Sequence, residues 1–172
     1  MDQERIASAI SGARQYLSER PDEARYRDSV ATATIDAGLR VLVRDAAGTS
    51  VLFTDMATGV GGSASAPSPG WLLRAAAASC VATLIAMRAA EVGVDLPGLQ
   101  VTVDSESDDR GILGMDDAVP SGPLGMRVIV RVGRSDASEA TLKEVVEWGK
   151  KHCPICDAIG RAVPIELAIQ ID

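Results

Sequence analysis

The chain has 172 residues, of which 47% are hydrophobic and 24% charged, and it carries a formal net charge of −7 at pH 7. This length suits one ordinary domain with a well-formed core, and this balance excludes a disordered or fibrous chain. Because phosphate binding needs a basic face, the 17 Lys and Arg against 24 Asp and Glu argue against a nucleic-acid partner. A soluble globular protein is predicted.

Neither a membrane segment nor a secretory signal is expected. The longest apolar run, residues 75–87, falls short of the about 20 residues that a membrane-spanning helix needs, so it predicts a core helix. The first five residues, MDQER, lack the basic start and apolar stretch of a secretory signal, which places the protein in the cytoplasm. In that reducing compartment the three cysteines are not expected to form a permanent disulfide framework.

The first half of the chain predicts a helix, a meander of strands and a second helix. Residues 2–19 form an amphipathic helix that ends before Pro21. Residues 58–70, rich in Gly, Ser and Ala, are a loop that leads into a long apolar helix over about 70–92, which Gly93 ends. The strands between the two helices, separated by turn signals, are predicted at 30–35, 39–43 and 50–53.

The second half alternates strand and helix patterns. A helix opening at Ser135 presents an apolar stripe that ends at Cys153, and a short helix follows Pro154 to about Arg161. Strands with alternating apolar residues are predicted at 99–104, 126–132 and 165–171, with a loop over 106–123. Strands in runs with hairpin-type links favour an antiparallel α+β fold. We expect residues 1–25 to be a helical extension and residues 26–172 to be the main domain.

Known nucleotide and metalloprotease motifs are absent from the sequence, and no cofactor is predicted. There is no Walker loop, no GxGxxG after a strand and no His-Glu-x-x-His, and the glycines at 59–62 are interpreted as a turn. The one histidine, His152, could join Cys80, Cys153 and Cys156 as metal ligands. However, adjacent His and Cys suit tetrahedral geometry poorly, so no metal site is predicted.

The segment His152-Cys153-Pro154-Ile155-Cys156 carries the chemistry that the residues themselves indicate. Since Pro favours the first helical position, Cys153 is an N-cap candidate whose sulfur faces unpaired backbone N–H groups, which favours the thiolate. Cys156 is either a second redox thiol or a small buried residue. His152 either caps the preceding helix or holds a proton near Cys153. Cys80, inside the apolar helix, would by itself be an inert core thiol.

Several features of the sequence follow one another in a characteristic order: Ala66-Pro67-Ser68-Pro69, then Leu72-Leu73, an Ala-rich helix carrying Cys80, and Cys153-Pro154 before a predicted terminal strand. This pattern resembles the OsmC/Ohr family. The resemblance extends from about Tyr26 to Asp172. It implies α+β subunits with antiparallel sheets around a long central helix, joined as an intertwined homodimer. It also implies that Cys80 attacks a hydroperoxide and becomes a sulfenic acid, that Cys153 condenses with it, and that lipoyl-type or other thiols reduce the disulfide.

The sequence departs from this family at the start of the central helix. Peroxidase members use an Arg in the preceding loop and a Glu near the helix start, whereas residues 45–73 contain no Arg, Lys or Glu, and Gly70 and Trp71 stand where the acid is expected. Three hypotheses follow. The first is hydroperoxide reduction by Cys80 and Cys153. The second is a binding protein on the same scaffold, with Trp71 and Met56 lining a pocket for a small apolar molecule. The third is a dithiol redox protein that uses Cys153 and Cys156.

Overall fold

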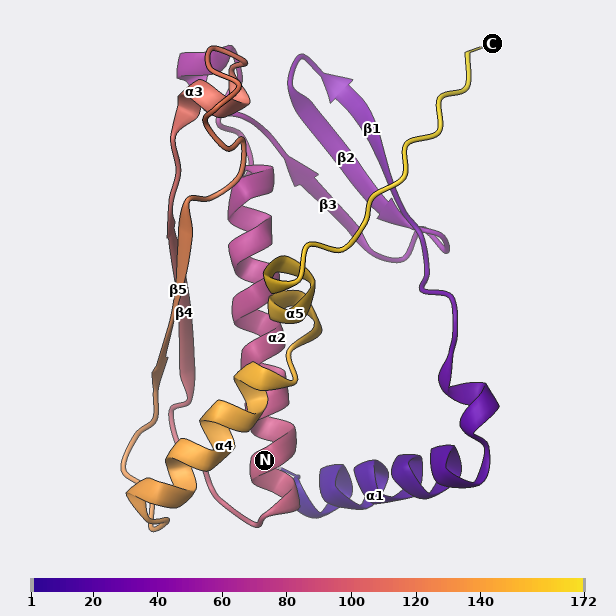
Figure 1. The fold of residues 1–172 in the computed structure, drawn as a ribbon, viewed down its shortest axis with the longest axis vertical. Coiled ribbons are helices and arrows are strands. Elements are labelled where there is room, and N and C mark those ends of the chain that lie inside the picture. The colour runs from indigo at the N-terminus through magenta and orange to yellow at the C-terminus, as the bar shows by residue number, and fades with distance from the viewer. Residues whose placement is uncertain (1, 172) are drawn as a thin grey trace. The chain divides into compact units, whose positions relative to one another are not determined.

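The computed structural model describes residues 2–171, and it confirms an α+β fold with antiparallel sheets and one long helix (Figure 1). The chain divides into two compact units. Ala9–Ala75 form the first, which we call the meander unit, and the segments before and after it form the second, which we call the cysteine unit because it holds all three cysteines. Helices α1 (Gln3–Glu19) and α2 (Pro69–Glu91) each contribute to both units.

The meander unit contains the predicted three strands, paired antiparallel in the order β1-β2-β3. Val43 of β2 pairs with Ala33 on one side and with Leu52 on the other. Gly38 turns the chain between β1 and β2 with φ +58, a left-handed conformation that favours glycine. The elements of this unit besides α1 and α2 are η1 (Pro21–Ala24), β1 (Ala31–Ala37), β2 (Arg40–Asp45), β3 (Val51–Thr54) and η2 (Thr58–Val60).

Helix α2 provides the centre of the cysteine unit. Its Val81, Ile85 and Ala89 are buried in one cluster, and Gly93 with φ +67 follows its last turn. By length and composition α2 could cross a membrane, but one such helix is weak evidence and a buried core helix passes the same test. Because Val81, Ile85 and Ala89 belong to the hydrophobic cluster, we interpret α2 as a core helix.

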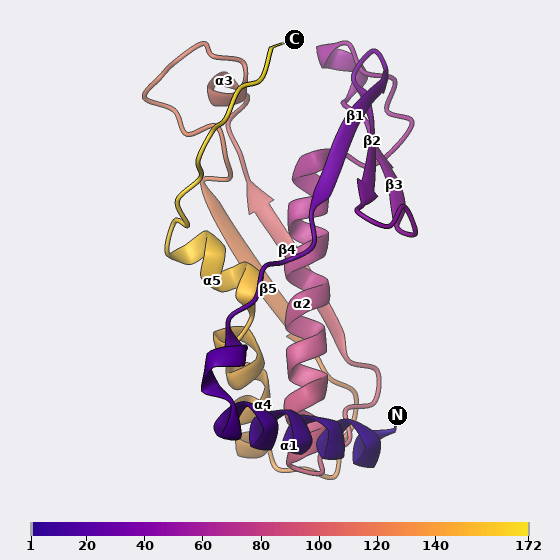
Figure 2. The same cartoon turned by 90° about the vertical axis from the view of Figure 1, so that its right-hand side faces the viewer.

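A two-stranded antiparallel sheet packs against α2. Strands β4 (Gln100–Glu106) and β5 (Gly125–Arg131) pair Val101 with Val130 and Val103 with Val128. Figure 2 shows both strands running past α2, and their inward valines adjoin its buried cluster. Between them lies the short helix α3 (Asp109–Ile112), which the sequence analysis placed in a loop. Its N-cap Asp108 accepts a hydrogen bond from the backbone of Arg110, a local signal that the polar composition hid.

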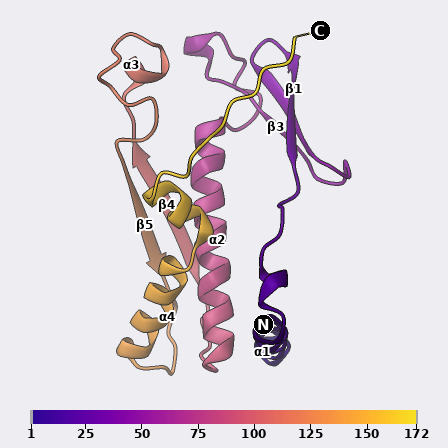
Figure 3. The same ribbon diagram turned by 45° about the vertical axis from the view of Figure 1, so that its right-hand side comes forward.

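Helices α4 (Glu139–Lys151) and α5 (Pro154–Gly160) complete the cysteine unit (Figure 3). The predicted start of α4 at Ser135 is wrong. Ser138 is the N-cap, and its hydroxyl accepts from the backbone N–H of Thr141 at 3.1 Å. The Ser135 hydroxyl instead donates to the carbonyl of Asp95 at 2.8 Å, which ties the start of α4 to the chain just after α2.

The predicted final strand at 165–171 is also wrong for the described part of this chain. Residues 163–171 form neither a helix nor a strand and belong to neither sheet. The alternating apolar side chains are strongly exposed: Ile165 95%, Leu167 84%, Ile169 73% and Ile171 89%. Alternation is the signature of a strand with one buried face, but a strand also needs a neighbouring backbone to pair with. No described strand of this chain provides one.

Candidate functional site

The three cysteines meet where the N-terminus of α5 approaches α2. Cys80 lies on α2, Cys153 is the N-cap of α5, and Cys156 is in the first turn of that helix. The thiols of Cys80 and Cys153 share a hydrogen bond, and the backbone N–H of Cys156 donates to Cys153 Sγ at 3.3 Å. All three are free thiols. The structure therefore brings together the two cysteines that the family resemblance paired and adds the third.

A close helix crossing positions these thiols. A Cβ at Gly149 of α4 would lie 2.5 Å from Ile85 Cγ1 and 2.7 Å from the Ile85 backbone nitrogen, so only glycine lets α4 approach α2 this closely. Gly149 precedes Cys153 by about one helical turn. Pro154 then starts α5 with Cys153 as its N-cap, as predicted, and the Cys153 side chain is fully buried against α2.

Hydrogen bonds favour the Cys153 thiolate. Burial, the largest single influence, raises the pKa of this thiol, but the hydrogen bonds it accepts outweigh burial and hold the pKa below its ordinary value. Its donors are the backbone N–H groups of Cys156 and Ile155 and the thiols of Cys80 and Cys156. The hydrogen bonds at the start of α5 therefore act in the predicted direction, towards the thiolate.

The other two thiols are less acidic than usual. Burial raises the pKa of Cys80, and the hydrogen bond and negative charge of Cys153 raise it further, while the backbone of Ile155 acts in the opposite direction. Burial and then the same two effects of Cys153 raise the pKa of Cys156 to about 11, with Lys150 acting in the opposite direction. Cys153 is thus the most acidic thiol of the cluster, and both of its cysteine neighbours are less acidic than usual.

His152 caps helix α4. Its backbone N–H and its Nδ1 both donate to the Trp148 carbonyl, at 3.0 and 2.8 Å, and its exposed ring stacks on the Trp148 ring with centroids 4.1 Å apart. Arg88 lies over the same Trp148 ring and pairs with Glu144 at 2.6 Å. Of the two roles considered for His152, these contacts fit the capping role. The stack joins side chains four residues apart at the end of α4, whereas the position of Arg88 over Trp148 depends on how α4 packs on α2.

Met56 and Trp71 belong to the meander unit, and their predicted pocket role stays a prediction. Met56 is half-buried, and the Trp71 side chain is 49% exposed. Beside Met56, sequence reasoning missed Asp55, which is almost fully buried. Hydrogen bonds from the backbone and hydroxyl of Ser65 lower the pKa of this carboxyl most. Asp55 therefore organises the loop that precedes α2. The sequence signal for this role was an acidic residue followed by several serines within a glycine-rich stretch.

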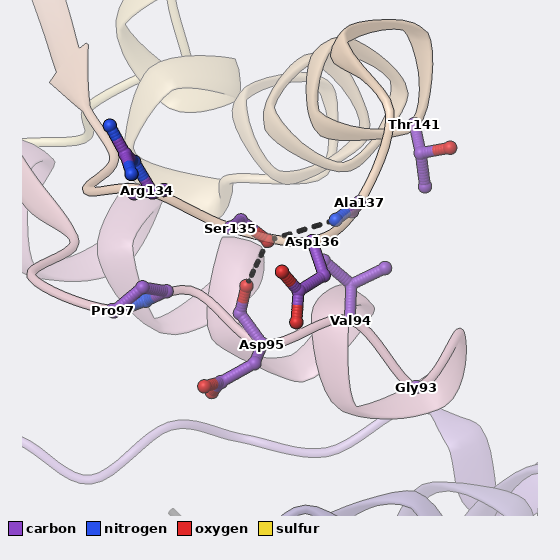
Figure 4. A pocket seen from close by; sticks show the side chains of 9 residues that line it. All are labelled: Gly93, Val94, Asp95, Pro97, Arg134, Ser135, Asp136, Ala137 and Thr141. Atoms are coloured by element: carbon purple, nitrogen blue, oxygen red, sulfur yellow. Dashed lines mark hydrogen bonds between the residues drawn. The ribbon is translucent and has the colours of Figure 1, made fainter.

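The cysteine unit has several surface pockets, and two of them differ in their access to the thiols. One of about 510 Å³ is lined by residues from the end of α2 and the start of α4, including Asp95, Asp136 and Arg134, and contains no cysteine (Figure 4). Another of about 280 Å³ has Cys156 in its wall. The residues that line it are Lys150, Lys151, Cys156, Asp157, Gly160 and Arg161. Only the second pocket gives access to a thiol of the cluster. Among residues 2–171, no group of three or more His, Cys, Asp or Glu side chains could hold a metal ion.

Comparisons with known proteins agree with this fold. The family model described as OsmC-like protein matches residues 62–168, which include all three cysteines. No match was found among curated proteins. Among solved structures, the OsmC-like protein of Mycoplasma pneumoniae is 15% identical with a TM-score of 0.66, and the superposition covers 80% of this chain and 90% of that one.

Two further structures carry more specific names. The organic hydroperoxide resistance protein OsmC of Legionella pneumophila is 20% identical, with a TM-score of 0.60 over 78% of this chain and 90% of that one. The organic hydroperoxide resistance protein OhrB of Bacillus subtilis is 19% identical, with a TM-score of 0.51 over 77% and 90%. At these identities the similarity shows a shared fold.

Proposed function

The chain belongs to the family of OsmC-like proteins, and from this membership we propose that it reduces organic or inorganic hydroperoxides with Cys80 and Cys153. The hydrogen bond between the two thiols carries the proposal, because it joins a half-buried thiol to a stabilised thiolate. The names of the Legionella and Bacillus structures support the choice of substrate class. A cytoplasmic location would keep both thiols reduced between turnovers.

In the first step, the proton of the Cys80 thiol passes along the hydrogen bond to the Cys153 thiolate. The Cys80 thiolate then attacks one oxygen of the hydroperoxide, and the O–O bond breaks. Cys80 becomes a sulfenic acid, and the alkoxide that leaves takes the proton back from Cys153 to become an alcohol. Cys153 therefore serves as the base that activates Cys80. Activation in this way comes from within the thiol pair and does not call for the loop arginine of the peroxidase members.

In the second step, the restored Cys153 thiolate attacks the sulfur of the Cys80 sulfenic acid. The new S–S bond replaces the S–O bond, and the hydroxide that leaves takes up a proton from the buffer to become water. The thiol pair has then lost two electrons, and the peroxide has gained them. A lipoyl group or another external thiol returns two electrons and restores both cysteines.

We further propose that the functional form is an intertwined homodimer. The exposed apolar residues of segment 163–171 support this, because a second copy of the chain could supply the strand partner that the described residues lack. Pairing of this segment with a partner subunit would also bury the apolar face that its alternating apolar residues form.

The test is consumption of cumene hydroperoxide and hydrogen peroxide with dithiothreitol or dihydrolipoamide as reductant. Cys80→Ser should lower the rate by at least about a hundredfold, because it removes the attacking sulfur. Cys153→Ser should slow the oxidation of Cys80 because the base is lost, and the sulfenic acid that does form on Cys80 should persist and be trapped by dimedone because no Cys153 condenses with it. Undiminished consumption by Cys80→Ser would refute the proposal. No turnover together with unreactive Cys80 would favour the alternative, a pocket for a small apolar molecule.

A further inference from the structure

Cys156 is the one thiol of the cluster that reaches a surface pocket. Its side chain is partly exposed and lines the pocket of about 280 Å³ described above, whereas Cys153 is fully buried. A disulfide between Cys80 and Cys153 would have one sulfur in the core and the other on a half-buried helix face. An external thiol must reach a sulfur along the S–S axis to reduce such a bond.

Building on the proposed function, we propose that Cys156 is a relay thiol that moves the disulfide from Cys80–Cys153 to Cys153–Cys156, where a small carboxylate-bearing thiol reduces it from the pocket beside Lys150 and Lys151. This assigns a redox role to Cys156 and a chemical class to the reductant. The hydroperoxide step on Cys80 stays as proposed above.

The relay is a sequence of thiol–disulfide exchanges. The Cys156 thiol loses its proton, and its thiolate attacks Cys153 Sγ. The Cys80–Cys153 bond breaks, and Cys80 leaves as a thiolate that takes up a proton. The external thiolate then attacks Cys156 Sγ and expels the Cys153 thiolate. A second molecule of the same thiol cleaves the mixed disulfide on Cys156. Two external thiols are thereby oxidised to one disulfide, and all three cysteines are free again.

The contacts around Cys153 suit both exchanges. Cys156 donates its backbone N–H to Cys153 Sγ at 3.3 Å, and its thiol is also hydrogen-bonded to that sulfur, so the attacking atom already lies beside its target. Cys153 and Cys156 occupy the N-cap and first turn of one helix, the arrangement of reversible Cys-x-x-Cys disulfides. Because Cys153 is the most acidic of the three thiols, it is also the best leaving group when the external thiol attacks Cys156.

The charge of Cys153 controls when Cys156 can react. After burial, the hydrogen bond and negative charge of Cys153 are the largest influences that raise the pKa of Cys156. Once Cys153 is part of a disulfide, that negative charge is gone, while Lys150 continues to favour the Cys156 thiolate. The pKa of Cys156 is therefore expected to fall after peroxide has been reduced, which raises the fraction of the nucleophilic thiolate at this position.

The pocket favours a negatively charged reductant. Asp157 pairs with Arg161 at 2.6 Å, which leaves Lys150 and Lys151 as the excess charge around Cys156. Both lysines lie in the last turn of α4 and are exposed. A thiol that carries a carboxylate would be attracted to them, and a pocket of this volume fits a small molecule rather than a folded domain.

Mass mapping tests the relay. The protein is oxidised with one equivalent of cumene hydroperoxide, alkylated and digested with trypsin. Cleavage after Arg74, Arg88, Lys151 and Arg161 leaves Cys80 in one peptide and both Cys153 and Cys156 in another. A disulfide within the second peptide is expected for the wild type, and a bond between the two peptides for Cys156→Ser. A wild-type protein that retains the bond between the peptides, with Cys156 alkylated, would overturn the relay.

Kinetics with mercaptopropionate, mercaptoethanol and cysteamine test the pocket, each rate being corrected for the thiolate fraction of the probe. We expect the anionic probe to reduce the wild type about tenfold faster than the cationic one, and Lys150→Gln/Lys151→Gln to narrow this ratio to about twofold. Lys143→Gln, on an exposed face of α4 outside the pocket, is the matched control and should keep the wild-type ratio. An unchanged ratio in the double variant would overturn the assignment of the reductant.

Cys156→Ser separates this inference from the proposed function. One equivalent of peroxide should still oxidise Cys80 in this variant, and its steady-state rate with mercaptopropionate should fall about tenfold because the surface disulfide no longer forms. Equal steady-state rates would refute the relay and leave peroxide reduction intact. If Cys80 is not oxidised in either protein, the proposed function itself fails.

Discussion

Two neighbouring regions near the end of the chain have similar apolar patterns and opposite surroundings. In the region of α4 and α5, apolar side chains at helical spacing are covered, and Val145 and Cys153 are completely buried against α2. In segment 163–171 the apolar side chains alternate regularly, yet they stay exposed. A pattern thus selects which face an element would bury, whereas burial itself needs an opposing surface at the right distance.

The largest expected effect comes from breaking the covered region at its closest approach. Gly149→Ala would place a Cβ 2.5 Å from Ile85 Cγ1 and 2.7 Å from the Ile85 backbone nitrogen, so α4 must move away from α2. We expect the free energy of unfolding to fall by about 3 kcal/mol. Urea denaturation measures this change.

Gly160→Ala is the control for that substitution, because nothing lies within 4 Å of a Cβ at Gly160. Its free energy of unfolding should stay within about 0.5 kcal/mol of the wild type. Equal losses for both variants would show that glycine flexibility, and not the contact between α4 and α2, determines the effect of Gly149→Ala.

An effect of intermediate size distinguishes the two regions, because the stability change caused by a substitution should depend on protein concentration in one region and not in the other. Val145→Ala should cost about 2 kcal/mol at every protein concentration, because the lost methyl groups are buried within one chain. Leu167→Asp should change the stability of a dissociated subunit by less than about 0.5 kcal/mol, because the side chain is 84% exposed. It should nevertheless weaken dimer formation.

Sedimentation equilibrium and thermal unfolding over a range of concentrations check this difference. If the Leu167→Asp variant forms a dimer as stable as that of the wild type, segment 163–171 is not the surface that a second copy covers. If the wild type itself is monomeric at all concentrations, the proposed homodimer is wrong.

The smallest effect concerns the titration of the thiols. Ultraviolet absorbance of thiolates should show a first step below the ordinary cysteine pKa, from Cys153, and a last step near a pKa of about 11, from Cys156. Cys153→Ser should remove the first step and move the last one down, because the hydrogen bond and charge that raise the pKa of Cys156 are lost. A last step that stays in place would show that burial alone sets it.

Local sequence signals predicted much of the candidate site. Pro154 placed Cys153 at an N-cap, and this was confirmed because a residue before proline and a helix start are both local constraints. The start of α4 was predicted at Ser135 instead of Ser138, since both serines are good caps and their choice depends on the bond from Ser135 to Asp95. The pairing of Cys80 with Cys153 came from the family resemblance, because no local pattern relates positions so distant in the chain.

Local patterns in the sequence were enough to place the first five strands, the long apolar helix and the thiolate-favouring start of α5, because these follow from periodicity and from residues in direct succession. Only the tertiary structure decided that Gly149 lets α4 pack on α2, that three thiols share one cluster with its acidic member at Cys153, and that segment 163–171 has no strand partner among the described residues. These features depend on distances between elements remote in sequence, and such distances are set when the whole core packs together.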